Sequence, residues 1–347
     1  MPNAREEEIV TQCFYEVAGA APTSVTTLRP HASERRMYRL THGDTSLIAV
    51  YNESRPENDT FVFLARHFRS LGLPVPEIHA YKPALGVYLE DDLGDTTLLD
   101  FLESSRAEAR SSFPAPAVEA YRKSIEFLPR FQIEAATTLD FSKCQASPGT
   151  FSAALRRDLD SFLKDFLTRL MPAFDSTAVR GDLQALLAAL AEPASAFFLY
   201  RDFQSRNIML VNGEPFFIDF QSGMPGPLQY DVASMLFQSS ARLPDDGRSE
   251  LLERYLSAAE QLGFEGRSDF LRLYPTFIIA RMLGVLGVYG RQGLVQKKEY
   301  FARSIPAALA TLLKQLEGQE LAIKLHGLHD CAKALLDAHT RQSDLTS

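Results

Sequence analysis

Cysteine is scarce in this chain, with only Cys13, Cys144 and Cys331 among 347 residues. Each cysteine lies more than a hundred positions from the next, so the sequence contains no Cys-x-x-Cys pair. This usage excludes a disulfide framework and is typical of a protein in the reducing cytoplasm.

The chain also lacks a long apolar run. Its longest apolar stretch, residues 277–289, spans 13 positions and is interrupted by Arg281, whereas a membrane span needs about 20 apolar residues. The N-terminal residues MPNAREEE are acidic and polar, without the basic-then-apolar order of a signal peptide. We therefore predict a cytoplasmic protein with no membrane partner, in which residues 277–289 form a buried helix.

Basic residues are outnumbered in this sequence. The 36 lysines and arginines stand against 44 acidic residues, which gives a net charge of −8 and a pI near 5.5. No segment gathers basic side chains into a track for a phosphate backbone, so no nucleic-acid partner is expected. The composition is otherwise that of an ordinary globular protein, 46% apolar and 23% charged, and its length allows two lobes with a core.

Short β-type runs fill much of the first 92 residues. Turn-forming residues at 41–44 separate two of these runs into a hairpin, and the apolar spacing over 59–70 predicts one substantial helix. A short helix is also expected at the start of the chain, over residues 6–19. The expected strands are 37–40, 46–51, 78–81 and 86–90.

From residue 97 onward the pattern is mostly helical. Asn212 and Gly213 interrupt it between two apolar runs, which predicts a β-hairpin. Helices resume at Asp231. The sequence thus predicts an α+β chain, with a small β-rich lobe over 1–92 that ends in an acidic hinge and a large helical lobe over 93–347. Earlier helices of that lobe are expected at 98–108, 118–138, 151–170 and 182–191.

Three polar residues around the predicted hairpin have a spacing that suits phosphoryl transfer. Asn207 lies five residues after Asp202, and Asp219 lies seventeen residues after it, beyond the return strand. This chemistry requires a carboxylate that accepts the proton of the acceptor hydroxyl, and oxygen ligands for the magnesium ion on the nucleotide phosphates. Two aspartates and an asparagine placed in this way can face one cleft.

The amino-acid sequences of these loops resemble those of a known family. The order Asp-x4-Asn, hairpin and Ile-Asp-Phe resembles the catalytic and metal loops of kinase-fold enzymes. The fuller pattern, Tyr-Arg-Asp-Phe-Gln-Ser-Arg-Asn at 200–207 and Gly-Pro-x-x-Tyr-Asp at 226–231, resembles the aminoglycoside phosphotransferase and choline kinase superfamily over residues 25–310. Within it, the loops and Leu-Gly-Val-Leu-Gly at 283–287 look most like bacterial cell-wall sugar kinases, which phosphorylate the anomeric hydroxyl of N-acetylmuramate and N-acetylglucosamine.

The resemblance implies a protein-kinase-like two-lobe fold, with ATP and Mg²⁺ as cofactors. It also implies that Asp202 is the catalytic base, that Asn207 and Asp219 are magnesium ligands, and that Asp231 braces the catalytic loop. Ordinary polar residues of a hairpin turn are the alternative, which the joint spacing disfavours. For Asp231, an N-cap of the following helix is an equally open interpretation.

The chain departs from this family's pattern at the phosphate-binding lysine, expected near Tyr51 on the third strand. No lysine precedes Lys82. A replacement cation would come from the expected nucleotide-covering loop, where Ser33 and backbone N–H groups would help to cradle the phosphates. Without that lysine, neither Glu53 nor Glu57 is expected to act as its helix partner. The replacement candidates, for which exposed hairpin arginines are the alternative, are Arg35, Arg36 and Arg39.

Other positions near these loops carry weaker expectations. Tyr200 stands where the family usually has histidine, a change that bears on packing more than on chemistry. Gln204 is placed to donate to the γ-phosphate, while Arg206 either reaches the phosphoryl group or pairs within the loop, which we favour. The hinge, whose backbone is expected to meet adenine, comprises Glu90, Asp91 and Asp92.

The acceptor site is expected near the predicted buried helix. Arg281 interrupts this apolar helix, and a charge there needs a partner or a ligand. An acidic sugar such as N-acetylmuramate would suit Arg281, with Tyr289 and Arg291 as further candidates. A salt bridge between Arg281 and a core acid is the alternative.

The sequence therefore predicts an ATP- and Mg²⁺-dependent kinase of a small-molecule hydroxyl, with N-acetylglucosamine or N-acetylmuramate as the first acceptors. An aminoglycoside- or choline-type kinase is the nearest alternative; its cationic acceptor would need a carboxylate cluster, and residues 233–240 carry none. A non-catalytic nucleotide-binding regulator is an alternative of another class, suggested by the missing lysine. The three intact residues Asp202, Asn207 and Asp219 argue against it.

Overall fold

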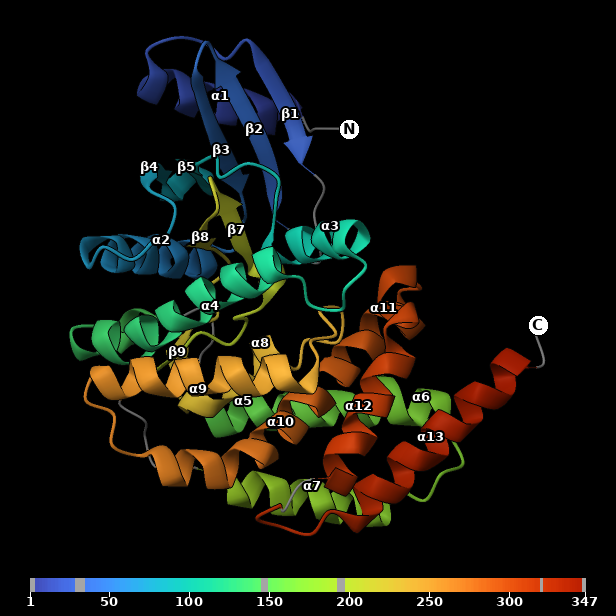
Figure 1. Cartoon of the computed structure of the whole chain (residues 1–347). Coiled ribbons are helices and arrows are strands. Elements are labelled where there is room, and N and C mark those ends of the chain that lie inside the picture. The colour runs from blue at the N-terminus through green and yellow to red at the C-terminus, as the bar shows by residue number, and fades with distance from the viewer. Residues whose placement is uncertain (1–3, 29–34, 145–148, 192–196, 319–320, 345–347) are drawn as a thin grey trace. The chain divides into compact units, whose positions relative to one another are not determined.

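A computed structural model describes residues 4–28, 35–144, 149–191, 197–318 and 321–344. The chain divides into two compact units (Figure 1). The first unit comprises 1–148 with 200–224, and the second comprises 149–199 with 225–347. A small antiparallel sheet at the N-terminal end and a helical C-terminal part confirm the predicted fold class, while the lobe boundary after residue 92 stays a prediction.

The first unit contains a five-stranded antiparallel sheet in the order β1-β2-β3-β5-β4. Four of its strands match the predicted runs. The edge strand β1 was not predicted, because its sequence SVTTL is largely exposed and has no alternating apolar pattern. The strands are β1 (Ser24–Leu28), β2 (Arg36–His42), β3 (Thr45–Tyr51), β4 (Ile78–Lys82) and β5 (Val87–Asp91).

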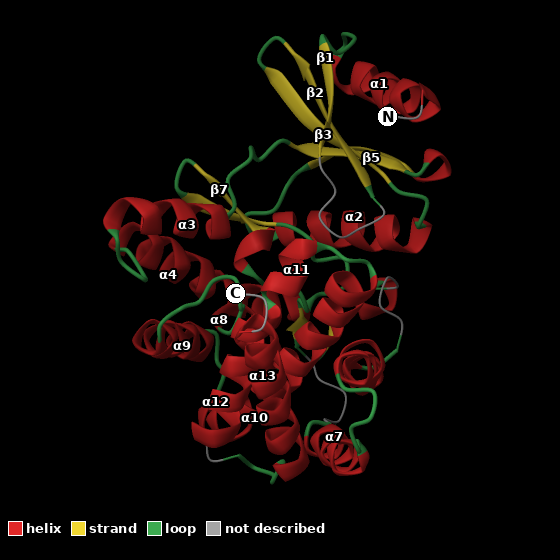
Figure 2. Cartoon of the chain, turned by 90° about the vertical axis from the view of Figure 1, so that its right-hand side faces the viewer, coloured by secondary structure: helices red, strands yellow, loops and turns green. Residues whose placement is uncertain are grey.

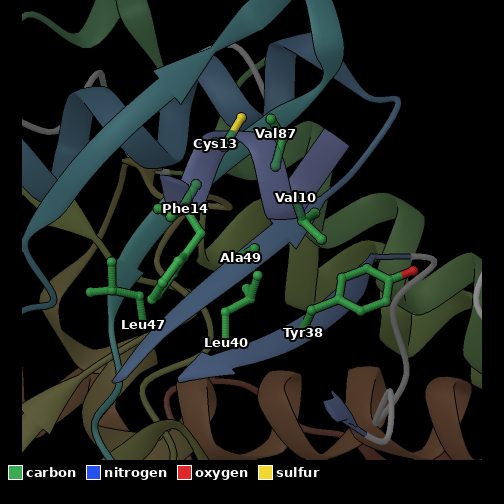
Figure 3. Packing of buried hydrophobic residues seen from close by; sticks show 9 residues of the cluster. Val10, Cys13, Phe14, Tyr38, Leu40, Leu47, Ala49 and Val87 are labelled. Carbon is green, nitrogen blue, oxygen red and sulfur yellow. The ribbon is translucent and has the colours of Figure 1, made fainter. Parts of the chain in front are cut away.

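Helix α1 (Ala4–Ala18) covers the first face of this sheet. Its buried residues Val10, Cys13 and Phe14 pack against alternate residues of β2, β3 and β5 (Figure 3). Because strand side chains alternate between faces, the intervening residues point to the second face. The sheet partners of α1 are Tyr38, Leu40, Leu47, Ala49, Val87 and Leu89. The second face carries Met37, Arg39, Ile48, Val50, Tyr88 and Glu90, and Arg35 continues its row just before β2.

Helix α2 (Arg55–Ser70) begins four residues before the predicted start, with a proline in its first turn, where the missing N–H costs nothing. The predicted Asn-Gly hairpin is confirmed as β7 (Ile208–Val211) and β8 (Glu214–Phe217), and both turn residues have positive φ. The remaining elements of this unit are η1 (Pro83–Leu85), α3 (Leu98–Ala109), α4 (Ala115–Pro129), the π-helical turn η2 (Arg130–Glu134), η3 (Ala135–Thr137), η4 (Phe141–Lys143) and η6 (Ser205–Asn207).

The second unit is built mainly of helices (Figure 2). The long helix α10 (Arg267–Tyr289) contacts α5, α8 and α12 and so forms the centre of this unit. The elements are α5 (Phe151–Ser161), η5 (Phe162–Leu167), α6 (Thr168–Leu170), α7 (Thr177–Ala189), β6 (Phe198–Leu199), the end of β9 (Met224–Pro225), α8 (Leu228–Leu236), α9 (Asp245–Gln261), η7 (Gly290–Val295), α11 (Glu299–Arg303), α12 (Ile305–Gly318) and α13 (His326–Asp344).

One helix of the described residues, 267–295, is long and apolar enough by composition to cross a membrane. Within the fold, 61% of its most apolar window is buried. Apolar helices enclosed in this way are core helices of globular proteins. The prediction of a buried helix over 277–289 is therefore confirmed.

Gly287 allows α10 to approach η5 closely. A Cβ atom at this position would lie 2.8 Å from the backbone nitrogen of Phe162. Backbone cannot move aside as a flexible side chain can, so Gly287→Ala should lower the free energy of unfolding by about 1–3 kcal/mol. Thermal or urea unfolding measures this change.

Gly181 in α7 supplies the matched control. A Cβ atom there meets nothing within 4 Å, and the residue is exposed in a helix interior. Gly181→Ala should raise stability by about 0.5–1 kcal/mol, because alanine loses less backbone entropy in a helix. Equal effects of the two substitutions would show that the close approach at Gly287 is not tight.

Candidate active site

The two loops predicted to be catalytic and metal-binding bring together the three polar residues singled out by spacing. The Asn207 side-chain amide donates to the backbone carbonyl of Asp202 at 2.9 Å and to Oδ2 of Asp219 at 3.3 Å. The Ile218 N–H donates to the carbonyl of Asn207 at 3.1 Å. Asp219 has φ of 67°, a left-handed conformation that a non-glycine residue adopts at a cost. The surrounding bonds hold the Asp219 carboxylate beside Asn207.

Tyr200 joins these two loops. Its hydroxyl donates to the backbone carbonyl of Ile218 at 2.6 Å, immediately before Asp219. The residue is fully buried, and its ring packs edge-on against Phe131 and Phe220. Tyr200, which stands where the family usually has histidine, thus connects the loop that carries Asp202 to the loop that carries Asp219.

Arg35 lies against the metal loop. Its Nη2 is 2.7 Å from Oδ1 of Asp219, and its Nε is 3.3 Å from Oε1 of Glu57 on α2. Asn52 in turn donates to the second oxygen of Glu57 at 3.0 Å. Glu57 is thus paired with an arginine that precedes β2, a partner that the sequence did not predict, in place of a lysine on β3.

The charge of Arg35 keeps Asp219 ionised. Burial would raise the pKa of the Asp219 carboxyl, but the Arg35 charge, hydrogen bonds from Gln221 and Arg35, and the Arg206 charge outweigh it. The pKa of Asp219 is therefore held below its ordinary value. An ionised carboxylate is the form that binds a divalent cation.

The other two candidate arginines have different partners. Arg36 points toward α1, where its Nε is 2.6 Å from Glu6 and its guanidinium lies 5.1 Å from the centre of the Tyr51 ring. Arg39 is bound by the hinge, with Nε 2.7 Å from Asp92 and Nη2 2.8 Å from Asp95. Ser33 lies outside the described residues.

The three hinge residues differ in their side-chain contacts. Asp91 accepts hydrogen bonds from the backbone N–H of Glu77 and contacts His79 at 2.8 Å. Asp92 is bonded to Arg39. The Glu90 carboxyl is buried, and its Oε2 has no hydrogen-bond partner among the described residues.

Two further loop residues lie between Asp202 and Asn207. Gln204 is buried, with 5% of its surface exposed, and its carbonyl accepts the N–H of Asn207 at 2.8 Å. Arg206 is exposed and contributes its charge to the low pKa of Asp219. The roles predicted for both remain predictions.

The acceptor candidates lie in the second unit. The Nε of Arg281 donates to Oγ of Ser234 at 3.0 Å, and its guanidinium lies 5.4 Å from the centre of the Tyr230 ring. These contacts are internal to the second unit, and both the acceptor role of Arg281 and its alternative, a salt bridge to a core acid, stay predictions. Tyr289 packs beside Phe301, and Arg291 is exposed in η7.

Asp231 is fully buried in the first turn of α8. That helix begins at Leu228, and Pro227 occupies its N-cap position. The N-cap interpretation of Asp231 is therefore wrong, because the helix starts three residues earlier than the sequence suggested. Its bracing role stays a prediction.

Several residues of the site carried no functional expectation from the sequence. Phe61 of α2 stacks on Tyr88 at 5.1 Å and on Phe220 at 4.7 Å between ring centres, which links the sheet to the metal loop. Gln221 donates to Oδ1 of Asp219 at 2.9 Å. Its place two residues after Asp219 was the available signal, whereas Phe61 matched an ordinary core position.

Residues 25–272 match the phosphotransferase enzyme family. The chain belongs to this family. N-acetylmuramate/N-acetylglucosamine kinase of Pseudomonas aeruginosa is 29% identical over 283 residues, covering 78% of this chain and 77% of that protein. The kinase of the same name from Neisseria meningitidis is 24% identical, and the match covers 80% of this chain and 81% of that protein.

Solved structures of related fold are also similar to this phosphotransferase. Amicoumacin kinase hAmiN, in complex with AMP-PNP, Ca²⁺ and Ami, matches with a TM-score of 0.63 at 14% identity, covering 93% of this chain and 97% of that one. Choline kinase LicA from Streptococcus pneumoniae matches with a TM-score of 0.58 at 12% identity, and the match covers 88% of this chain and 99% of that one. The family match and the kinases among the relatives together show that the chain is an ATP-dependent phosphotransferase with an alcohol acceptor. The predicted enzyme class is confirmed.

The hydrogen bond of Tyr200 can be tested by removing one oxygen. Tyr200→Phe should lower the free energy of unfolding by about 1–3 kcal/mol, because it leaves the part-buried Ile218 carbonyl without this donor. It should also lower kcat, since the carbonyl lies next to Asp219. Urea unfolding and steady-state kinetics measure the two effects.

Tyr274→Phe is the matched control in α10. The Tyr274 hydroxyl is buried without a hydrogen-bond partner among the described residues, so removing it should leave stability unchanged or raise it. A Tyr200→Phe protein as stable as wild type would contradict the proposed link between the loops.

Proposed function

We propose that this phosphotransferase transfers the γ-phosphoryl group of ATP, with Mg²⁺, to a hydroxyl of an amino sugar, N-acetylglucosamine or N-acetylmuramate. The main support for phosphoryl transfer is the position of Arg35, which is bonded to both Asp219 and Glu57. The acceptor class is supported by the names of the relatives, which are N-acetylmuramate/N-acetylglucosamine kinases over most of their length.

Arg35 takes the place of the missing strand lysine in this proposal. The side chain of Arg35 belongs to the second face of the sheet, diagonally across from Val50 on β3. A guanidinium there neutralises nucleotide phosphates and, with five N–H donors, can keep a carboxylate while it binds a phosphate oxygen. Glu57 fixes the guanidinium from the side of α2.

The residues around Asp219 suit a magnesium ion. The Asn207 amide nitrogen is directed to Asp202 and Asp219, which leaves its Oδ1 for a cation, and Asp219 supplies an ionised carboxylate. Described residues include no group of three or more His, Cys, Asp or Glu that could hold a metal. Two protein oxygens are nevertheless what Mg²⁺ commonly takes, with phosphates and waters as its other ligands. When bound, it would neutralise the charge on the phosphates.

Asp202 performs the proton transfer in the proposed reaction. Its carboxylate accepts the proton of the sugar hydroxyl while the hydroxyl oxygen forms a bond to the γ-phosphorus. The bond between that phosphorus and the β,γ-bridging oxygen breaks, and ADP leaves with its electron pair. Gln204 is proposed to contact the transferred group, while Arg206, exposed on the same loop, is proposed to act mainly through its charge beside Asp219.

On the acceptor side, Arg291 and Tyr289 are the preferred contacts. Arg291 is exposed in the π-helical turn η7, where it can pair with the carboxylate of an acidic sugar. Arg281 is a weaker choice because Ser234 and Tyr230 already contact it. Asp231 is proposed to brace the catalytic loop rather than to contact a substrate.

The test is ATP consumption with Mg²⁺ across a panel of N-acetylglucosamine, N-acetylmuramate, plain hexoses, an aminoglycoside and choline. We expect turnover with the N-acetylated amino sugars. Asp202→Asn should lower kcat by about 10²–10⁴-fold, because an amide cannot accept the proton, while nucleotide affinity and unfolding temperature stay close to wild type.

Turnover with only the aminoglycoside or choline would contradict the proposed acceptor. Undiminished kcat in Asp202→Asn would contradict the role of Asp202. Nucleotide binding without turnover of any panel member, or without a need for Mg²⁺, would favour a non-catalytic regulator.

A further inference from the structure

Helix α2 has a side that the proposed reaction does not use. Residues three or four positions apart lie on the same side of a helix. On one side Glu57 pairs with Arg35, and Phe61, four residues later, stacks on Phe220. The opposite side of α2 and Tyr81 of β4 together line a groove of about 410 Å³, the α2 groove. Its residues on α2 are Asp59, Val62, Phe63, Arg66 and His67.

The α2 groove has the size and the walls of a small-molecule site. Such sites have volumes of about 300–1,000 Å³ and are lined mainly by apolar and aromatic side chains, with few polar groups. Val62 is buried, and the rings of Phe63 and His67 lie within 22° of parallel, with 6.2 Å between their centres. Tyr81 adds a further ring from β4. These side chains suit the apolar or aromatic body of a ligand.

The acid of the α2 groove is already paired. Oδ1 of Asp59 accepts a hydrogen bond from the Tyr81 hydroxyl at 2.5 Å, and Oδ2 lies 3.3 Å from Nε of Arg55. Both carboxylate oxygens therefore have donors, and the Arg55 charge balances that of Asp59. The pair with Tyr81 joins β4 to α2 and leaves little negative charge for a cationic ligand.

The cation of the α2 groove has no such partner. The Arg66 side chain is exposed and makes no hydrogen bond or ion pair within the described part of the chain. By contrast Arg69, three residues further along α2, is paired with Glu77 at 2.8 Å. Lys143 of η4 adds positive charge, because its Nζ lies 5.0 Å from the centre of the Phe63 ring. The groove thus combines apolar walls with an unpaired guanidinium, which can bind a carboxylate through two parallel N–H···O bonds.

We propose that the α2 groove binds a small organic carboxylate. The carboxylate pairs with the Arg66 guanidinium, and the apolar or aromatic body of the ligand packs against Val62, Phe63 and Tyr81. None of these residues has a role in the proposed phosphoryl transfer, so this binding site does not depend on the nucleotide or on the acceptor.

Three probes that share a naphthalene body and differ in their polar group test the site: 2-naphthoate, neutral 2-naphthamide and cationic 2-naphthylmethylammonium. Their dissociation constants are measured by calorimetry on the whole chain. Wild type should bind 2-naphthoate about 10-fold more tightly than 2-naphthamide, as expected for a charge-assisted contact. The ammonium probe should bind least tightly, because it meets the charges of Arg66 and Lys143.

Two substitutions separate the charge of the groove from its walls. Arg66→Gln should bring the affinity ratio of 2-naphthoate to 2-naphthamide close to 1. It should unfold at the wild-type temperature, since Arg66 makes no contact that the substitution would break. Phe63→Ala should weaken both probes by a similar factor, because apolar contact with the ring does not depend on the polar group.

Arg69→Gln is the matched control. It removes the same charge from the same helix, but Arg69 bonds the Val75 carbonyl and Glu77 and does not line the α2 groove. Its affinity ratio should therefore stay that of wild type. The wild-type ratio should also persist with saturating ATP and Mg²⁺, because the nucleotide is proposed to bind elsewhere.

The proposal is overturned if 2-naphthoate does not bind, if the amide or the ammonium probe binds as tightly, or if Arg66→Gln keeps the wild-type ratio. Equal loss of the ratio in Arg69→Gln would contradict it too, since the preference would then reflect the general charge of α2. Displacement of 2-naphthoate by ATP would place the probe in the nucleotide site and contradict a separate groove. Phosphoryl transfer is tested independently by the acceptor panel, so failure here leaves the proposed function standing.

Discussion

The ion pair between Arg35 and Asp219 is the interaction on which the site depends. It joins the start of β2 to the residue that follows the β7–β8 hairpin by two positions, across more than 180 residues of sequence. The Arg35 side chain is only 14% exposed, and a second carboxylate, Glu57, holds it from α2. The two carboxylates are more exposed, at 33% for Asp219 and 29% for Glu57, so the cost of breaking the set falls mainly on the largely buried Arg35 guanidinium.

Aromatic packing supports this polar link. The rings of Tyr88, Phe61 and Phe220 stack in sequence from the sheet through α2 to the residue after Asp219. Tyr200 meets Phe220 edge-on and also bonds the carbonyl before Asp219. Asp219 is therefore fixed on both sides, which offsets its unfavourable backbone conformation.

Much of this arrangement can be predicted from the sequence. Strands β2 to β5 coincide with short runs rich in apolar residues, and Asn212-Gly213 is typical of a tight hairpin. The even spacing of Arg35 and Arg39 also separates them from Arg36, since strand neighbours face opposite sides. Choosing between Arg35 and Arg39 needed the structure, because Arg39 is paired with Asp92 and Asp95.

The errors have a common physical origin. The pairing of Glu57 with Arg35 was not predicted, because contact between α2 and the start of β2 depends on how the chain folds rather than on spacing. Strand β1 was missed because an exposed edge strand needs few apolar residues.

The most direct measurement of the central claim compares kcat/KM for ATP in Arg35→Ala and Arg36→Ala. The two arginines are adjacent in sequence, but Arg35 bonds Asp219 whereas Arg36 bonds Glu6 near α1. If Arg35 replaces the strand lysine, Arg35→Ala should lower kcat/KM by about 10²-fold or more, as expected for loss of a charge-assisted contact to phosphate. Arg36→Ala should stay within about threefold of wild type. Equal losses in the two variants, or a folded Arg35→Ala enzyme with wild-type kcat/KM, would contradict the account.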